Sequence, residues 1–575
     1  MHVGIDLGTT NTVLAYARRN RYGIVEPSVV KIMQLDEYNN SIQEELLPSV
    51  LFYDFHGNIF IGRKAKYMKY YHPDRTVYNS KRYMGTSATF EFGDKKFTPV
   101  DVAAYILNVC KRTIDVYYSG TPLEQVTITV PASFNTDQIR DTRNAALKAG
   151  FEEDKIRIIP EPTAAFISFV NDQFEVLGSD RRIDLSTPRR VLVFDLGGGT
   201  CDIVVMEVLQ KDRIIKIEEL AVGRYSELGG ADFDRYAASY LLGKFLASQK
   251  IDWEEIEKSE RSRMANKLMA FCEKAKESFS GQMMYNLSGM KNNLIYTAEI
   301  PEFWRGKPQH FSITLEEYDE STSSLYYLPD RPIRTMEDYE KCKNIVTPIY
   351  ETLRMYDIEK DSIDYILLTG GMSLYYKIKQ RLKELFPHGE VISIHDPMEA
   401  VAKGAAIFSF YEVEIKSRRK EAHKKSLNPL MAPHQDIHDS DVEIITKTVL
   451  AESILIDVEE GLPREIISKN QAVPCKGYIK DAFRVTSPSG VKIDIYAGES
   501  PYDSKLRMQK SHIGRFTSPV NVGTPLDIEY EIDENKYLKL RVIIQDLHNT
   551  TIELDVESLD VEPNVEKSSY QHDVR

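Results

Sequence analysis

The sequence predicts a large layered α/β region followed by an all-β sandwich, and three observations support this prediction. Between residue 1 and about residue 412, strand-like apolar runs alternate with helical patterns, as is typical of α/β domains. From residue 448 to about residue 558, short β-type runs follow one another closely, which favours a sandwich. Within the α/β region one strand-and-turn pattern occurs twice, 189 residues apart when counted from Asp6 to Asp195, which indicates two related halves that face each other across a cleft.

The composition indicates a large folded protein without a nucleic-acid partner. The chain has 575 residues, about four domains at roughly 150 residues each. Its 73 Lys and Arg against 87 Asp and Glu give a net charge of −14, which repels a phosphate backbone. With 42% hydrophobic and 28% charged residues, the collagen-like, mainly disordered and membrane classes are excluded.

The sequence contains neither a membrane segment nor a disulfide framework. No apolar run approaches the roughly 18 residues that a membrane span needs, and no apolar signal segment opens the chain. We therefore expect a cytoplasmic protein without a membrane partner. The five cysteines are scattered, odd in number and free of CxxC spacing, so we expect free thiols in a reducing compartment.

The repeated pattern is a β-hairpin with a small, polar tip. In the first copy, strands over residues 3–7 and 13–16 flank a Gly-Thr-Thr tip. In the second copy, strands over 191–194 and 203–206 flank the tip DLGGGT. The two copies share the motif Asp-Leu-Gly at the end of the entering strand.

Glycine-rich tips suit a phosphate chain held from both sides, because glycine lets backbone N–H groups come close to phosphate oxygens. Thr9, Thr10 and Thr200 would add hydroxyl donors. Asp6 and Asp195 would hold a hydrated magnesium ion, which usually takes only one or two carboxylates. One such hairpin could equally be a plain tight turn, but two copies favour the phosphate site.

A third glycine motif follows the strand predicted over residues 365–369. The pair Gly370 and Gly371 forms a turn, and an amphipathic helix comes after it. Free N–H groups at the start of that helix are available to a polar ligand. The apolar positions of the helix are Leu374, Ile378, Leu382 and Leu385.

The segment from residue 413 to about 440 is charged and helix-poor in pattern, which indicates a linker or a surface insertion. A short apolar run, residues 441–445, follows it. The chain ends on a polar stretch that we expect to be disordered.

Several common nucleotide and metal motifs are missing from the sequence. It has no GxxxxGK[ST], no GxGxxG and no HExxH, so the phosphate site must be of another type. Phosphoryl transfer depends mainly on positioning and charge neutralisation, so a lysine and a carboxylate should complete the site.

Together the motifs resemble those of the actin, sugar-kinase and heat-shock ATPase superfamily, and more closely the heat-shock protein 70 (DnaK-type) chaperones. In family order the matching strings are GIDLGTTNT from Gly4, TVYNSKRYMG from Thr76, ITVPASFN from Ile128, IIPEPTAA from Ile158, VFDLGGGTCD from Val193, LGGADFD from Leu228, EKAKESFS from Glu273, LLTGGMS from Leu367 and EAVAKGAA from Glu399. Two further strings, ISKNQAVP from Ile467 and VKIDIYAGE from Val491, resemble the family's peptide-binding β-domain.

The resemblance implies an α/β actin-like (ribonuclease H-like) two-lobed ATPase domain followed by an all-β sandwich peptide-binding domain. The implied divisions are an ATPase domain over 1–412, a charged insertion and apolar interdomain linker over 413–447, the β-domain over 448–558 and a polar tail over 559–575. The resemblance stops near residue 558, so the expectation is a short form without the family's helical lid.

The resemblance also implies the roles of individual residues. Lys81 resembles the family's catalytic lysine, and Glu161 resembles the acid of its magnesium and water network, where Asp6, Asp195 and Thr200 also act. From the residues alone, a solvated lysine beside Arg82 and a helix-start carboxylate would be the alternatives. The implied metal residues are Asp6, Asp195 and Glu161. The implied nucleotide-binding residues are Gly8, Thr9, Thr10, Asn11, Gly197, Gly198, Gly199, Thr200, Asp202, Gly229, Gly230, Glu273, Lys276, Ser280, Gly370, Gly371 and Ser373.

Several positions depart from the family pattern. Arginines that stack on adenine are replaced by Glu277 and Leu374, and Met372 replaces a small polar residue, so adenine recognition should be weaker. Pro131 matches a proline used in interdomain signalling, but the arginine expected eight residues later is Ile139. The aspartate expected at the end of the linker is Thr446, so interdomain coupling should differ as well. Cys201, beside the second tip, is expected to be a packed thiol.

The function implied by the resemblance is an ATP-dependent chaperone that hydrolyses ATP to control binding and release of unfolded or extended polypeptides. Its implied cofactors are ATP or ADP and Mg²⁺, with K⁺ as a further candidate, and its implied partners are client polypeptides, a J-domain co-chaperone and a nucleotide-exchange factor. Val491 and Ile493 could line the peptide cleft or form the core face of their strand. The alternatives are a small-molecule kinase on the same nucleotide fold and a nucleotide-bound scaffold without turnover.

Overall fold

The structure, a computed structural model, describes most of the chain. The predicted tail over 559–575, residues 427–442 of the charged segment and Cys342 lie outside the described residues. The described ranges are 1–21, 24–93, 95–118, 120–175, 183–211, 214–223, 227–285, 294–327, 343–426, 443–457, 462–498, 507–516, 519–533, 536–544 and 551–554.

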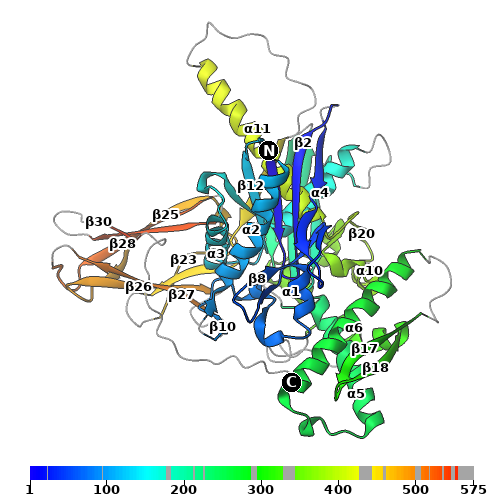
Figure 1. Cartoon of the computed structure of the whole chain (residues 1–575). Coiled ribbons are helices and arrows are strands. Elements are labelled where there is room, and N and C mark those ends of the chain that lie inside the picture. Colours follow the sequence, from blue (N-terminus) through cyan, green and yellow to red (C-terminus); the bar gives the residue numbers. More distant parts are fainter. Residues whose placement is uncertain are drawn as a thin grey trace.

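Two mixed sheets with the same strand order form the α/β part of the molecule, which confirms the predicted repeat (Figure 1). In each sheet the first strand pairs antiparallel with the hairpin strand after it and parallel with a later strand. In spatial order the first sheet contains β13 (Ile156–Pro160), β12 (Gln125–Val130), β1 (His2–Leu7), β2 (Asn11–Arg19) and β3 (Val25–Val29), with β6 (Leu46–Pro48) beside β2. The second contains β20 (Glu390–Ser393), β19 (Tyr365–Thr369), β14 (Arg189–Leu196), β15 (Cys201–Lys211) and β16 (Ile214–Val222), and continues into two further strands described below.

The long helices of the α/β part are α2 (Pro99–Tyr117), α3 (Thr136–Lys148), α4 (Glu161–Glu175), α5 (Gly230–Gln249), α6 (Lys258–Tyr285) and α11 (Ala400–Ser426). Shorter helices are α1 (Arg63–Met68), α7 (Leu315–Thr322), α9 (Val346–Met355) and α10 (Tyr376–Leu385). Capping boxes on Thr98 and Asn135 begin α2 and α3, so the side chain at each helix start satisfies a free N–H group.

Among the described residues, three large apolar cores and one small cluster hold the α/β part together. Helices α4 and α11 pack between the two sheets, where Ala164 and Ala405 meet residues of both. The outer face of the first sheet packs against α2 and α3, and that of the second against helices that include α5, α6 and α10. Strands β12 and β14 are buried along most of their length, as expected for sheets covered on both faces.

Small sheets and 3-10 helices decorate the two halves. They include the hairpins β4 (Ile32–Leu35) with β5 (Ser41–Glu44), β10 (Phe90–Phe92) with β11 (Lys95–Phe97) and β17 (Ile295–Trp304) with β18 (Lys307–Thr314), and the sheet of β8 (Ile59–Ile61), β7 (Leu51–Tyr53) and β9 (Thr76–Val77). The 3-10 helices are η1 (Pro73–Arg75), η2 (Ser80–Tyr83), η3 (Glu153–Lys155), η5 (Trp253–Glu255), η7 (Ser323–Leu325), η8 (Lys360–Ser362) and η9 (Gly371–Leu374).

The C-terminal β part consists of two antiparallel sheets that share one core, as predicted, and lies beside α3 (Figure 1). Val491 and Ile493 are buried in this core, so their interpretation as part of a peptide cleft is wrong. One sheet contains β23 (Arg464–Ile467), β22 (Ser453–Asp457), β26 (Gly490–Gly498) and β27 (Arg507–Arg515); the other contains β25 (Cys475–Arg484), β28 (Pro525–Ile532), β29 (Leu538–Ile544) and β30 (Thr551–Leu554).

The segment that joins the two parts differs from its predicted form. Helix α11 runs on to Ser426, so the beginning of the charged stretch is helical and not helix-poor. Strand β21 (Glu443–Val449) then pairs in parallel with β16, from Ile214 opposite Glu443 to Glu218 opposite Lys447. It also pairs antiparallel with β24 (Ala472–Val473) of the β part. The second sheet therefore extends through β21 into the β part.

The turn between β28 and β29 packs against α3. Tyr537 is buried in the core of the first sheet, and the Arg143 guanidinium lies 4.8 Å from its ring centre. Ile139 contributes to the same boundary, where it lines a small cavity together with Leu450 and Ala451. Ile139, where the resemblance implies an arginine, thus contributes an apolar side chain to this boundary.

Candidate functional site

One cavity of about 420 Å³ lies where the two hairpin tips and the Gly-Gly turn meet. It brings together most of the residues predicted for the nucleotide site, although they come from widely separated parts of the chain. The predicted residues that line it are Asp6, Gly8, Thr9, Thr10, Asn11, Lys81, Glu161, Asp195, Gly197, Gly198, Thr200, Gly230, Glu273, Lys276, Ser280, Gly370 and Gly371.

Four predicted residues lie behind the cavity wall. The Gly199 carbonyl accepts a hydrogen bond of 2.6 Å from Arg82, and the Gly229 N–H donates to Asp232 at the start of α5. Asp202 accepts a 2.8 Å hydrogen bond from Ser133, two residues after Pro131, and the Ser373 N–H donates to the Gly370 carbonyl. These residues shape the tips and the turn and do not border the cavity.

Several lining residues could not be predicted, because most are apolar and resemble core residues in the sequence. They include Tyr375 directly after the Gly-Gly turn, and Met398 before α11. The full set is Val13, Leu46, Gly281, Tyr375, Pro397, Met398 and Val401. The three residues that depart from the family pattern, Glu277, Met372 and Leu374, line the cavity as well.

Lys81 and Glu161 form a buried ion pair at the cavity. Lys81 belongs to η2 and Glu161 is the first residue of α4, and their side chains are only 8% and 9% exposed. The lysine ammonium also lies 5.7 Å from the ring centre of Phe134. The interpretation of Lys81 as a solvated lysine is therefore wrong, and the cavity contains a buried lysine and carboxylate of the kind expected from the sequence.

Buried carboxylates crowd the same end of the cavity. Burial and the nearby Glu161 charge raise the pKa of Asp6 to about 7, although Lys81 opposes the shift. Burial and Glu161 likewise raise the pKa of Asp202 to about 7, and that of Asp195 well above its usual range. The ionised carboxylates therefore repel one another more than Lys81 can compensate. A divalent cation would relieve this repulsion.

The spacing of these carboxylates sets a limit on how a metal could be held. Among the described residues, no three His, Cys, Asp or Glu side chains converge closely enough to ligate one ion directly. Magnesium usually keeps several of its waters, so the acidic end fits a hydrated ion that the carboxylates contact through water.

The hairpin tips approach each other too closely for side chains. A Cβ on Gly198 would lie 2.8 Å from the Thr10 Cβ, and one on Gly229 would lie 2.5 Å from the Gly198 carbonyl carbon. Only glycine allows this approach. The cavity is therefore lined by main-chain groups of both halves, as expected for a phosphate cradle.

Charged side chains line the opposite end of the cavity. Lys66 of α1 makes a 2.7 Å ion pair with Glu273 of α6, which lines the cavity. This ion pair connects the two halves. Lys276 makes a 2.8 Å ion pair with Asp234 and donates to the Gly230 carbonyl at 3.1 Å. Burial raises the pKa of Asp234 to about 6, against the lowering effect of Lys276.

The fold and the cavity define a protein in which two halves of the same topology enclose a cavity between glycine-rich tips. Sequence comparison gives the family. A family model described as "Hsp70 protein" matches residues 2–294 and 338–541, so the chain belongs to the HSP70 family. The resemblance stated from the motifs is thus confirmed.

The chain is similar to proteins named "Chaperone protein DnaK". It is 29% identical to the one from Thermosipho melanesiensis over 540 residues and to the one from Thermotoga maritima over 541 residues. It is 28% identical to the one from Thermosipho africanus over 537 residues. Each match covers 93% of this chain and 76% of the relative.

Among the helices of the described ranges, none combines the length and the apolar character needed to cross a bilayer.

Proposed function

We propose that this HSP70-family protein is a chaperone that hydrolyses ATP to control the binding and release of unfolded or extended polypeptides. The observation that carries the proposal is the cavity, which places a buried lysine–carboxylate pair beside two main-chain phosphate cradles. A cavity of about 420 Å³ is in the range of small-molecule and cofactor sites.

In this proposal the domains follow the sequence divisions. Residues 1–412 form the actin-like ATPase domain, 413–447 the insertion and linker, and 448–558 the peptide-binding β-sandwich. ATP or ADP would occupy the cavity, with its phosphates at the tips and its ribose and base near Glu273 and Lys276. Asp6, Glu161 and Asp195 would hold hydrated Mg²⁺, which would neutralise phosphate charge, and K⁺ is a further candidate ion.

Within the active site, each residue has a proposed role. Lys81 would neutralise charge on the terminal phosphate and orient the attacking water, and Glu161 would hold Lys81 in place through their ion pair. The Thr9, Thr10 and Thr200 hydroxyls would donate to phosphate oxygens. Main-chain N–H groups of the tips would supply the remaining donors without any rearrangement.

A continuous set of contacts could carry the nucleotide state to the β part. Thr163, two residues after Glu161, donates a 2.8 Å hydrogen bond to the buried Glu219. The other Glu219 oxygen accepts a 3.2 Å hydrogen bond from the Val449 N–H of β21. The buried Lys536 ammonium of the β28–β29 turn also interacts with Glu219, although burial lowers its pKa. Glu219 thus lies between the cavity, the connecting strand and the β part.

The proposed partners are extended client polypeptides, a J-domain co-chaperone and a nucleotide-exchange factor, and the proposed location is the cytoplasm. The rival proposal of a small-molecule kinase would leave the β part and its connection through β21 without a role. The scaffold proposal is suggested only by the changed base end of the cavity.

Two measurements on the wild-type protein test the proposed function. We expect slow, magnesium-dependent ATP hydrolysis and release of a fluorescent apolar peptide when ATP is added. ATP turnover that occurs only when a sugar or another small molecule is present to accept the phosphoryl group would instead favour the kinase, and the absence of both activities would favour the scaffold.

The base end gives a further prediction, since Glu277 and Leu374 occupy the positions of the family's stacking arginines and line the cavity. Changing Glu277→Arg and Leu374→Arg together should tighten ATP binding, because each cation–π contact contributes about 0.5–2 kcal/mol. Discrimination of ATP from GTP should also increase. Calorimetric titration with both nucleotides measures this, and Glu316→Arg, an exposed position on α7, controls for added positive charge. Unchanged ATP affinity in the double variant would contradict the prediction.

A further inference from the structure

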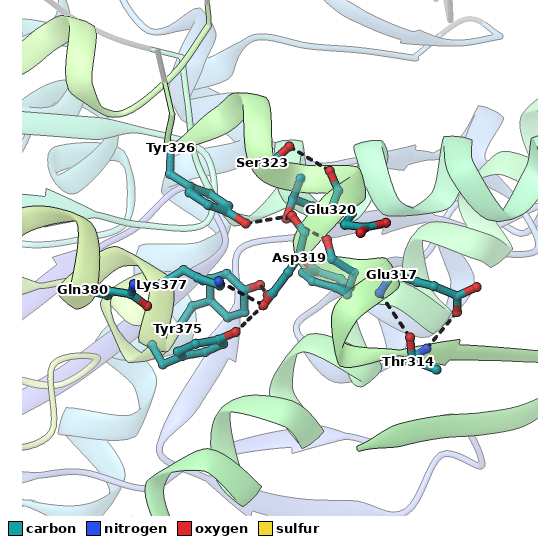
Figure 2. Close-up of polar contacts among 12 residues, drawn as sticks. Thr314, Glu317, Asp319, Glu320, Ser323, Tyr326, Tyr375, Lys377 and Gln380 are labelled. Atoms are coloured by element: carbon teal, nitrogen blue, oxygen red, sulfur yellow. Dashed lines mark hydrogen bonds and ion pairs between the residues drawn. The ribbon is translucent and has the colours of Figure 1, made fainter. Parts of the chain in front are cut away.

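Asp319 on α7 is the acceptor for three consecutive residues that follow the Gly-Gly turn (Figure 2). The Tyr375 and Tyr376 hydroxyls both donate to its carboxylate, and the Lys377 ammonium lies 3.3 Å from it. Asp319 and Tyr375 are 56 residues apart in the sequence, so no sequence pattern predicted the contact.

The Asp319 side chain is only 14% exposed, so its carboxylate oxygens are largely shielded from water and need these hydrogen-bond partners. Its helix is held in place at its start and at Asp319 itself. Thr314 and Glu317 form a capping box at the start of α7, and the Tyr326 hydroxyl donates a 2.7 Å hydrogen bond to the Asp319 carbonyl. The carboxylate is therefore presented from a rigid element.

Tyr375 connects this carboxylate to the cavity. The residue lines the cavity, and its ring packs against Phe233 and Tyr318 with centroid separations of 6.1 and 5.8 Å. The turn before it is closed by hydrogen bonds from the Ser373 N–H to Gly370 and from the Tyr375 N–H to Met372. The position of Tyr375 therefore fixes the turn from which Met372 and Leu374 line the cavity.

We propose that Asp319 is a positioning residue for the base of the bound nucleotide, because its hydrogen bonds to Tyr375 and Tyr376 hold the 370–375 turn against the base end of the cavity. This inference rests on the proposed function only in taking the ligand to be a nucleotide. Asp319 touches neither the phosphate cradles nor the Lys81–Glu161 pair. Replacing it should therefore change the affinity for the base of the nucleotide and not the affinity for its phosphates.

The test compares ATP with inorganic tripolyphosphate, which lacks the ribose and the base, as magnesium-dependent ligands of the full-length protein. Asp319→Asn should weaken ATP binding about tenfold, the size of one hydrogen bond to a charged group, and leave tripolyphosphate affinity within about twofold. Glu320→Gln is the matched control, since it removes a charge from the next residue of the same helix, where the side chain is exposed. It should change neither affinity.

Tyr375→Phe keeps the ring and removes only the hydroxyl, so it tests the link itself. It should reduce the ratio of ATP to tripolyphosphate affinity in the same direction, and adding Asp319→Asn should give less than the product of the two effects. Equal loss of both affinities in Asp319→Asn, or loss of neither, would overturn the inference. If wild-type protein binds ATP but does not release peptide, the proposed function is overturned, and the ratio of ATP to tripolyphosphate affinity still decides the inference about Asp319. If wild-type protein binds neither ATP nor tripolyphosphate, the proposed function and the inference are both overturned.

Discussion

Replacing Lys81 with alanine should slow ATP turnover about 10²- to 10³-fold and leave ATP bound in the cavity. The reduction is that expected when one preorganised group that stabilises the transition state is removed. Binding should persist because the main-chain groups of both tips and the Glu273 and Lys276 end of the cavity are unchanged. Single-turnover hydrolysis of pre-bound ATP, with filter binding of the same complex, measures the two quantities separately.

A control is needed because Lys81→Ala leaves Glu161 buried without its partner. The double variant Lys81→Met with Glu161→Gln removes both charges while keeping similar volumes. This double variant should bind ATP and hydrolyse it as slowly as Lys81→Ala does. Wild-type rates in Lys81→Ala would show that Lys81 is not part of the catalytic machinery.

The second large effect is expected at Gly370, where alanine should reduce nucleotide affinity about a hundredfold. The residue has a φ of 81°, a conformation that costs other residues roughly 1–2 kcal/mol. An added Cβ would also lie 2.5 Å from the Leu196 carbonyl oxygen and 2.6 Å from its carbon, both in the main chain of the second hairpin. The strand must shift, which displaces the main-chain donors of the second tip; because a hydrogen bond to a charged group contributes roughly 1.5–3 kcal/mol, the loss of one or two reduces affinity by about a hundredfold.

The neighbouring glycine provides the matched control. A Cβ on Gly371 would meet only the Met398 side chain, at 3.3 Å from its Cγ and 3.4 Å from its sulfur, and that side chain can move. Gly371→Ala should therefore change nucleotide affinity about twofold or less. If calorimetry finds the two alanine variants equally impaired, close packing at Gly370 is not what shapes the second tip.

The elements whose residues carry a local signal were predictable from the sequence. Both hairpins have an apolar strand, a glycine-rich tip and a second strand, and the structure has β1 with β2 and β14 with β15 at those places. The β-type runs of the C-terminal part are also strands in the structure. The short β24 and the strand β27 are further strands that no such run indicates. The spacing of apolar residues and the residue types of the turns determine these elements, so a single sequence is enough to predict them.

Other features depend on contacts between distant residues, which no local pattern contains. Lys81 looks solvated beside Arg82 in the sequence, yet it is buried because α4 brings Glu161 to it. The charged end of α11 has no helical pattern in the sequence, yet it is helical, because Lys, Arg and Glu are good helix formers once a helix has begun. Apolar lining residues such as Met398 cannot be distinguished from core residues without the fold.

The connecting strand β21 has a consequence for how the length of this segment can vary. Its side chains alternate, with Ile444 packed against the core between the sheets and Ile445 41% exposed. Main-chain pairing with β16 tolerates many side chains, and the β-branched Thr446 suits a strand well. Inserting or deleting one residue, however, would turn every side chain to the opposite face and move the pairing with β24 out of register. Variation in this segment should therefore be tolerated at exposed positions such as Ile445 and restricted in length, because the strand sets the register between the two parts of the molecule.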